Sequence, residues 1–223
     1  MTPARTLRSP RTAALLAAAA VIAPAATSAA SAETKLTGDP EGVQLARDVD
    51  AAYAGVPAIR SRALLTGKGI RFRIATVDIL EGGLVVRGYA RVVVDSVLVE
   101  TVDTPTGAFE RRGGKGCWTR TGEGSVGDTV FTRDGERFDR PTQGDPGTLV
   151  LTGGTDKGAR VRAIIAADTK TLLRLTVTDA GLTLSVTYRT LTSTPAIPRI
   201  TRRCEPPKRR SAARRAGTIG PGV

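Results

Sequence analysis

Histidine and asparagine are absent from this sequence of 223 residues, and cysteine occurs only at Cys117 and Cys204. Without histidine, the chain cannot build a Ser-His-Asp or Cys-His catalytic group, and it lacks the commonest protein ligand for metals. Without asparagine, it cannot carry N-linked glycans. Aromatic residues make up only 4% of the chain, so the core of any fold must consist largely of Val, Leu and Ile.

A pair of carboxylates or a Ser-Lys arrangement remains as a route to catalysis. Asp134, Glu136 and Asp139 lie close together, but three arginines alternate with them in a segment with loop-like composition. We interpret this cluster as a solvated charge network rather than as a pair of catalytic carboxylates. We therefore expect no enzymatic activity, no cofactor and no metal.

The first 32 residues have the organisation of a secretory signal peptide. Arginines at positions 5, 8 and 11 precede an alanine-rich run from Ala13 to Ala23, and Ala30-Ser31-Ala32 ends the segment. We expect cleavage after Ala32. The alternative, a transmembrane helix, needs about 20 mainly apolar residues, and Pro24 interrupts this shorter run. No cysteine lies near the cleavage site, so we expect a secreted, soluble, extracytoplasmic protein without a lipid anchor.

The net charge of +12 is concentrated outside the central part of the chain. Three basic residues precede residue 12 and seven lie between Arg202 and Arg215, so 23 basic and 20 acidic residues remain over 33–201. We expect one β-rich domain over 33–204 and a basic, disordered tail over 205–223. The tail lacks the aromatic residues that favour binding of nucleic acid. It is either simply solvated or in contact with an anionic polymer or membrane surface.

Alternating apolar and polar residues predict a mainly β fold. The alternation is clearest from Ala159 to Arg189, where turn-forming residues at 168–171 and 179–181 separate three strands of an antiparallel meander. Strands are also expected from Ile70 to Ile79, with a bulge near Ala75 or Thr76 where the apolar positions change parity. The segment 122–147 is rich in Gly, Asp and Pro, and predicts loops and short edge strands.

One helix is expected near the start of the domain. Asp39-Pro40-Glu41 supplies a cap, a proline for the first turn and an acidic residue near the positive end of the helix dipole. Apolar residues follow at helical spacing as far as Val56, and Pro57 ends the segment, which predicts a helix of about 16 residues. Its apolar face is expected to pack on the sheet.

The two cysteines are expected to form a disulfide. In an exported chain an even number of cysteines indicates bridging, and Cys117 and Cys204 would close a loop of 87 residues. Two free thiols are the alternative. Trp118, the only tryptophan, is expected to pack beside the bridge.

Four segments resemble exported actinobacterial proteins of the LolA-like lipoprotein-carrier and lipid-carrier superfamily. They are LARDVDAAYAGV (45–56), GKGCW (114–118), the run from Ile164 to Leu191 with its Asp-x-x-Thr turn, and the closing P-x-x-P-R-I-T-R-R-C (195–204). The resemblance covers roughly residues 40–204. It implies an incomplete, strongly curved antiparallel barrel over an N-terminal helix, with an apolar cavity for acyl chains. A closed β-sandwich would fit the same alternation and would leave no lipid site.

Two functions are open at this point. The first is a non-enzymatic carrier for an acyl chain of a lipid or lipoprotein, and the second is a structural or adhesive envelope module whose tail binds anionic wall polymer. We expect a monomer that binds no nucleic acid. The residues expected to line the lipid site are Leu45, Val49, Tyr53, Phe72, Ile74, Val86, Leu175, Val177, Leu184 and Val186.

Overall fold

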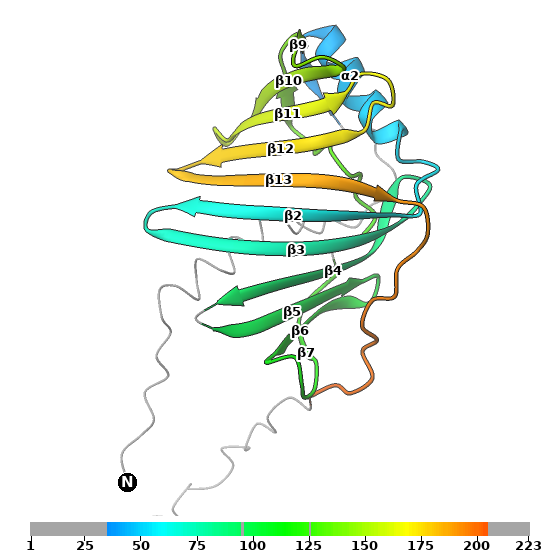
Figure 1. Cartoon of the computed structure of the whole chain (residues 1–223), viewed down its shortest axis with the longest axis vertical. Helices are drawn as coiled ribbons and strands as arrows, with labels where there is room; N and C mark the ends of the chain where they lie inside the picture. The colour runs from blue at the N-terminus through cyan, green and yellow to red at the C-terminus, as the bar shows by residue number, and fades with distance from the viewer. Residues whose placement is uncertain (1–34, 95, 125, 205–223) are drawn as a thin grey trace, which may run out of the picture.

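The computed structural model describes residues 35–94, 96–124 and 126–204. The expected signal peptide with its cleavage site and the expected basic tail lie outside these residues. The described part of the chain contains one helix and thirteen strands, and all thirteen strands belong to a single sheet (Figure 1). No helix in this part has the length and apolar character needed to cross a membrane.

The sheet is open and almost entirely antiparallel. The pairing of β1 with β8 is parallel, and the other neighbouring pairs are antiparallel. The mainly β, incomplete-barrel prediction is confirmed, and the closed sandwich is wrong because every described strand belongs to one sheet. In sheet order the strands are β1 (Thr37–Gly38), β8 (Glu136–Phe138), β10 (Thr148–Thr155), β11 (Arg160–Ala166), β12 (Leu172–Asp179), β13 (Leu182–Leu191), β2 (Ala58–Gly67), β3 (Ile70–Glu81), β4 (Leu84–Val94), β5 (Val97–Thr104), β6 (Gly107–Arg112) and β7 (Thr119–Gly122), with β9 (Thr142–Gln143) beside β10.

Helix α2 (Pro40–Ala51) begins as the sequence predicts and ends earlier than expected. The Asp39 carboxylate accepts hydrogen bonds from the backbone N–H groups of Glu41 and Gly42, at 3.0 and 3.4 Å. After Ala51 the chain tightens into turns in which the Tyr53 N–H donates to the Asp50 carbonyl at 3.1 Å. The helix therefore has 12 residues, and Tyr53 lies in the following turn.

We call the face of the sheet on which α2 packs the inner face and the opposite one the outer face. The register between β2 and β3 is continuous from Ala58–Ile79 to Gly67–Ile70. The bulge expected near Ala75 or Thr76 is therefore wrong, and the register shifts instead between Ile79 and Leu80, against β4. The parity argument failed because it assumed an apolar inner face throughout, whereas Thr76 is on that face together with Asp78.

Buried apolar side chains form three clusters. The helix-end cluster, on the inner face, joins α2 to strands at the β1 end of the sheet: Leu45, Ala46, Val49, Tyr53, Ile59, Leu80, Phe131, Phe138, Leu151, Val161, Ala163, Ile165 and Leu172. The central cluster, also on the inner face, contains Ala63, Leu65, Ile74, Leu184 and Val186. The outer cluster, on the outer face near β7, contains Val102, Phe109 and Trp118.

Candidate functional site

The central cluster is built from strand residues alone. Its buried members come from β2, β3 and β13, and its half-buried neighbours come from β3, β4, β12 and β13. These side chains share one face because Ala63 pairs with Ile74 and Val186, while Leu65 pairs with Phe72 and Leu184. The half-buried neighbours are Ile70, Phe72, Ala90, Val92, Leu175, Val177, Leu182 and Tyr188.

Six of the ten predicted lining residues belong to this cluster or pack against it. Alternation predicted that these side chains share one face, and they do, because each of their strands keeps its apolar side chains on that face over this stretch. That they line a lipid site stays a prediction. They are Phe72, Ile74, Leu175, Val177, Leu184 and Val186.

The three residues predicted to lie opposite these strands belong to the helix-end cluster instead. Leu45 and Val49 are buried on α2, which contacts β1, β8 and β10. The Tyr53 hydroxyl accepts a hydrogen bond from the backbone N–H of Leu172 at 2.9 Å, and burial raises the pKa of Tyr53 to about 12. Leu175 and Tyr188 pack against both clusters and connect them.

Val86 lies outside both inner clusters. It falls at the register shift of β4, where Ile79 pairs with Arg87 and Leu80 pairs with Val85. Because one residue is inserted there, Val85 takes the inward position and packs against the helix-end cluster. The sequence could not locate this shift, since Leu84, Val85 and Val86 are all apolar.

A polar row separates the two inner clusters. Ser61 pairs with Thr76 in the register, and their hydroxyl groups are 2.6 Å apart and buried. In the next row, Asp78 lies opposite Gly88, which lies opposite Asp103. A Cβ on Gly88 would be 3.2 Å from the Asp78 carboxylate, so glycine leaves room for this side chain.

Asp78, in the polar row, has a raised pKa. Burial raises its pKa to about 7 and the Asp103 carboxylate adds to the rise, while the positive charge of Arg133 and a hydrogen bond with Thr76 oppose it. Sequence reasoning missed this row because the expected bulge turned Thr76 and Asp78 away from the core. The signal available was the polar interruption itself, between the apolar run ending at Ile74 and Leu80.

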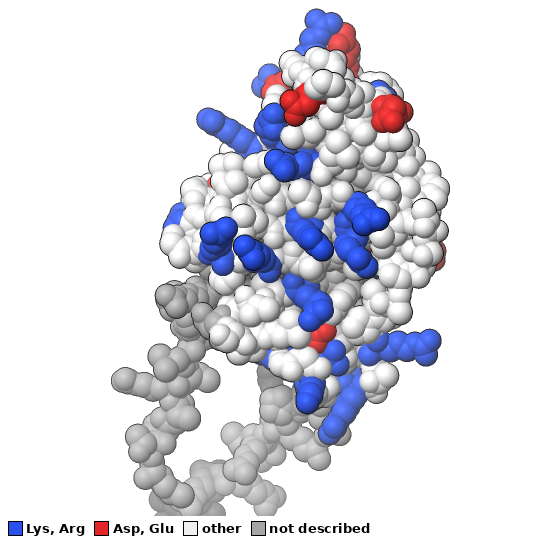
Figure 2. Space-filling view, in the orientation of Figure 1, with Lys and Arg blue, Asp and Glu red and all other residues white. Residues whose placement is uncertain are grey.

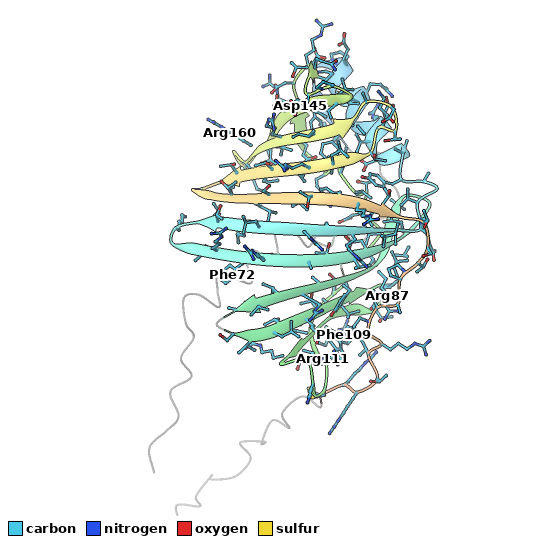
Figure 3. All side chains as sticks on the ribbon, viewed as in Figure 1. Phe72, Arg87, Phe109, Arg111, Asp145 and Arg160 are labelled. Atoms are coloured by element: carbon cyan, nitrogen blue, oxygen red, sulfur yellow. A yellow bond between two sulfur atoms is a disulfide. The ribbon has the colours of Figure 1, made fainter. Side chains whose placement is uncertain are left out.

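The predicted disulfide between Cys117 and Cys204 is confirmed. It fixes the C-terminal segment on the outer face, where the Trp118 N–H donates to the Arg202 carbonyl at 2.7 Å and the Cys204 N–H donates to the Trp118 carbonyl at 2.9 Å. Trp118 is 1% exposed, so it packs beside the bridge as expected. Arg111 lies on Trp118, 4.5 Å from the ring centroid, close to Phe109 (Figure 3).

The acidic residues expected to form a solvated network each have a separate structural contact. Asp134 accepts from the Lys35 N–H at 2.9 Å, and Asp139 accepts from the Thr152 hydroxyl at 2.9 Å. Glu136 is buried, which corrects the prediction of solvation; it accepts from the Arg133 N–H at 2.9 Å, and burial raises its pKa. In the part of the chain that is described, no group of three or more acidic or cysteine side chains is arranged to hold a metal.

The segment 122–147 contributes more to the core than its composition indicated. Phe131 and Phe138 are buried, with ring centroids 5.5 Å apart, and β8 pairs on both sides rather than forming an edge. The Asp50 carboxylate at the end of α2 accepts from the backbone N–H groups of Phe131 and Thr132, at 2.8 and 3.1 Å. No periodicity marks these residues, so only the burial reveals them.

No family model matches this sequence, and no curated protein matches it. Solved structures do resemble its fold. LprF from Mycobacterium bovis is 14% identical over 74% of this chain and 99% of its own, with a TM-score of 0.46. The lipoprotein LppX from Mycobacterium tuberculosis is 14% identical over 71% of this chain and 99% of its own, also at 0.46. A LolA superfamily protein from Nitrosomonas europaea is 9% identical over 70% of this chain and 96% of its own, at 0.35.

Proposed function

We propose that this protein is an extracytoplasmic, non-enzymatic carrier that holds an acyl chain of a lipid or lipoprotein against the central cluster. The observation that carries the proposal is the composition of that cluster, whose members all come from one face of one sheet. A sheet face normally buries its apolar side chains against a second layer. The described members of the central cluster all lie in strands of one sheet, and an acyl chain would supply a second layer against them.

The arrangement of the central cluster along the strands suits an extended alkyl chain. The apolar side chains run along β13, β2 and β3, from Leu182 and Ile70 to Val186 and Ile74. Each CH₂ group transferred from water to such a surface contributes about 0.8 kcal/mol, so a chain of a dozen carbons gains binding energy steadily along its length. The polar row with Ser61 and Thr76 limits the apolar surface toward α2.

The test is uptake of a fluorescent fatty acid by delipidated protein. Leu184→Glu places a carboxylate among apolar side chains, and we expect it to abolish uptake because the charge must stay hydrated or become protonated. Ser185→Glu is the matched control: it introduces the same charge one residue away, on the outer face of the same strand. We expect uptake by Ser185→Glu to equal that of the wild type.

Folding of both variants is checked by circular dichroism and thermal unfolding. A wild-type protein that takes up no fatty acid, together with a Leu184→Glu variant that does not fold, would show that the central cluster is a closed core. If the wild-type protein does take up fatty acid, mass spectrometry of lipids extracted from the native protein identifies the class of the bound chain.

A further inference from the structure

Arginine side chains cover the outer face over five adjacent strands, β11, β12, β13, β2 and β3. Figure 2 shows basic side chains spread across this face, with acidic side chains mostly at its margins. Alternation explains the pattern, because Val161, Leu175, Leu184, Leu65 and Phe72 point inward and their neighbours in sequence point outward. The outward arginines are Arg160, Arg162, Arg174, Arg189, Arg60, Arg62, Arg71 and Arg73.

These eight arginines, which we call the arginine face, have no acidic partner on their own strands. By the same registers, the other outward positions are occupied by apolar residues, Thr or Ser, such as Leu64, Thr176 and Thr187, except for Glu81 at the end of β3. The ion pairs within the described residues involve Arg111, Arg112 and Arg140, so none involves the arginine face. All eight residues are exposed. The result is a concentrated positive surface on a body whose net charge is only +3 over residues 33–201.

Exposed apolar side chains adjoin the arginine face. Val93, at the end of β4, is 58% exposed and lines a shallow pocket together with Arg71 and Arg73. Leu173, next to Arg174, is 42% exposed. A soluble polyanion offers no apolar environment for such side chains, whereas a bilayer accepts them at the level of its headgroups.

We propose that the arginine face docks on the surface of an anionic lipid bilayer, with Val93 entering the interface at its margin. Guanidinium groups bind phosphate oxygens in pairs of parallel hydrogen bonds, which matches the headgroups of anionic phospholipids. Five adjacent strands spaced by roughly 4.8 Å bring several arginines close together on one face. No aromatic side chain points outward from these strands, so stacking on nucleic-acid bases is not provided for.

This inference stands apart from the proposed acyl-chain site, because the two use opposite faces of the same strands. A carrier that docks through its outer face keeps its inner face turned away from the bilayer. Either proposal can fail without the other, and the measurements below separate them.

The experiment is co-sedimentation of the purified protein with phosphatidylcholine vesicles that contain or lack phosphatidylglycerol. We expect binding to the anionic vesicles alone, and weaker binding as salt increases. The triple variant Arg62→Gln/Arg73→Gln/Arg162→Gln should bind the anionic vesicles on the order of a hundredfold more weakly, since each basic side chain near such a surface strengthens binding about fivefold. Its uptake of fluorescent fatty acid and its melting temperature should equal those of the wild type.

Two controls test which part of the protein binds the vesicles and whether a bilayer is required. Arg209→Gln/Arg210→Gln/Arg214→Gln removes the same charge from the basic tail, and should retain most of the binding. Val93→Ser should weaken binding to vesicles severalfold and leave any binding to soluble polyphosphate unchanged. The proposal is overturned if the tail variant loses as much vesicle binding as the face variant. It is also overturned if the wild type binds polyphosphate and no vesicles, or binds both types of vesicle equally.

Discussion

The two ends of the sheet each bury apolar side chains, but on opposite faces and under different covers. At the β1 end, helix α2 covers the inner face, and Val49, Phe138 and Ile165 are fully buried between them. At the β7 end, the outer face is covered by an extended segment that brings Ile200 against Phe109 and Trp118. A continuous sheet therefore need not bury the same face along its whole width, because burial follows whichever segment covers each part.

The covers differ in what holds them. Helix α2 is held by many apolar contacts, and the close approach of Gly42 to the Asp139 carbonyl leaves no room for a Cβ, which would lie 2.1 Å from the oxygen. The C-terminal segment has few apolar side chains and is held by the disulfide, by Arg203 above the Phe109 ring at 5.0 Å, and by the Arg87 guanidinium, which donates to the Pro198 carbonyl at 3.0 Å. The stability of the outer cluster therefore depends on a few individual contacts of the C-terminal segment, including the disulfide.

The largest expected effect comes from opening the disulfide. Cys204→Ser should destabilise the outer cluster by about 4 to 5 kcal/mol, the loop-closure value for 87 residues in the chain-entropy model. Trp118 is the only tryptophan, so its fluorescence follows this end of the sheet while far-ultraviolet circular dichroism follows the whole. In urea, the tryptophan signal of the variant should change at a lower concentration than the circular dichroism signal.

Phe138→Ala is the matched change at the other end. It removes a fully buried ring from the helix-end cluster and should cost about 3 to 5 kcal/mol. Because this cluster joins α2 to several strands, both signals should shift together. Coincident transitions in Cys204→Ser, or separated ones in Phe138→Ala, would contradict the view that only the outer cluster depends on a local bond.

Sequence patterns predicted the parts of this fold in which one chemical rule holds over many residues. Alternation from Leu182 to Val186 identified the inner face of β13, and Asp39 with Pro40 identified the start of α2. The cysteine pairing followed from there being only two cysteines in an expected exported chain. The alternation and the helix cap are patterns of residues close together in sequence, and two cysteines allow only one intramolecular pairing.

The failures occur where tertiary contacts replace the local rule. Asp78 points inward because Gly88, on the next strand, leaves space for it. Phe131 is buried from an irregular segment that the Asp50 carboxylate holds in place. The outer cluster needs a cover supplied by residues some 90 positions later than Phe109. Each of these partners lies on another strand or segment, so the periodicity of a single strand carries no information about them.

The polar row provides an intermediate effect that depends on pH. The pKa of Asp78 is raised to about 7 in the folded protein from an ordinary value of 3.8. The folded state therefore holds this proton more tightly than the unfolded state, and its contribution to stability is complete below pH 3.8 and is lost as the pH rises through 7. Asp78→Asn should remove about 3 kcal/mol of this loss between pH 4 and pH 8.

Urea unfolding at a series of pH values measures this contribution. Asp179→Asn, at the exposed end of β12, is the control and should keep the pH dependence of the wild type. If Asp78→Asn and the wild type lose the same stability between pH 4 and pH 8, the Asp78 carboxyl is solvated rather than part of the inner face.

The smallest effect on stability is expected for an exposed ion pair near helix α2. A less exposed ion pair at the outer cluster allows the two ends of the sheet to be compared. Arg140 contacts Glu41 in the first turn of α2, with 70% and 59% of the two side chains exposed. The hydrogen bond and charge of Arg140 lower the pKa of Glu41, but water screens such exposed pairs and competes for both groups. Arg140→Gln should leave the melting temperature unchanged.

Arg111 forms the corresponding pair at the outer cluster, where it contacts Glu100 at 2.8 Å with 20% and 7% of the two side chains exposed. Burial alone would raise the pKa of Glu100, but hydrogen bonds from Tyr89 and Arg111 lower it overall. Arg111→Gln removes this compensation and the contact with Trp118, so it should lower the free energy of unfolding by about 2 kcal/mol.

The difference between the wild type and Arg111→Gln should depend on pH. The lowered pKa of Glu100 stabilises the folded wild-type protein above the ordinary pKa of glutamate, so the wild type should lose this stability as the pH falls, and Arg111→Gln should lose less stability over the same range. Tryptophan fluorescence during urea unfolding at pH 7 and pH 4 distinguishes the two variants. Equal effects of Arg140→Gln and Arg111→Gln at pH 7 would mean that exposure does not separate the two pairs, and that the outer cluster depends on its disulfide alone.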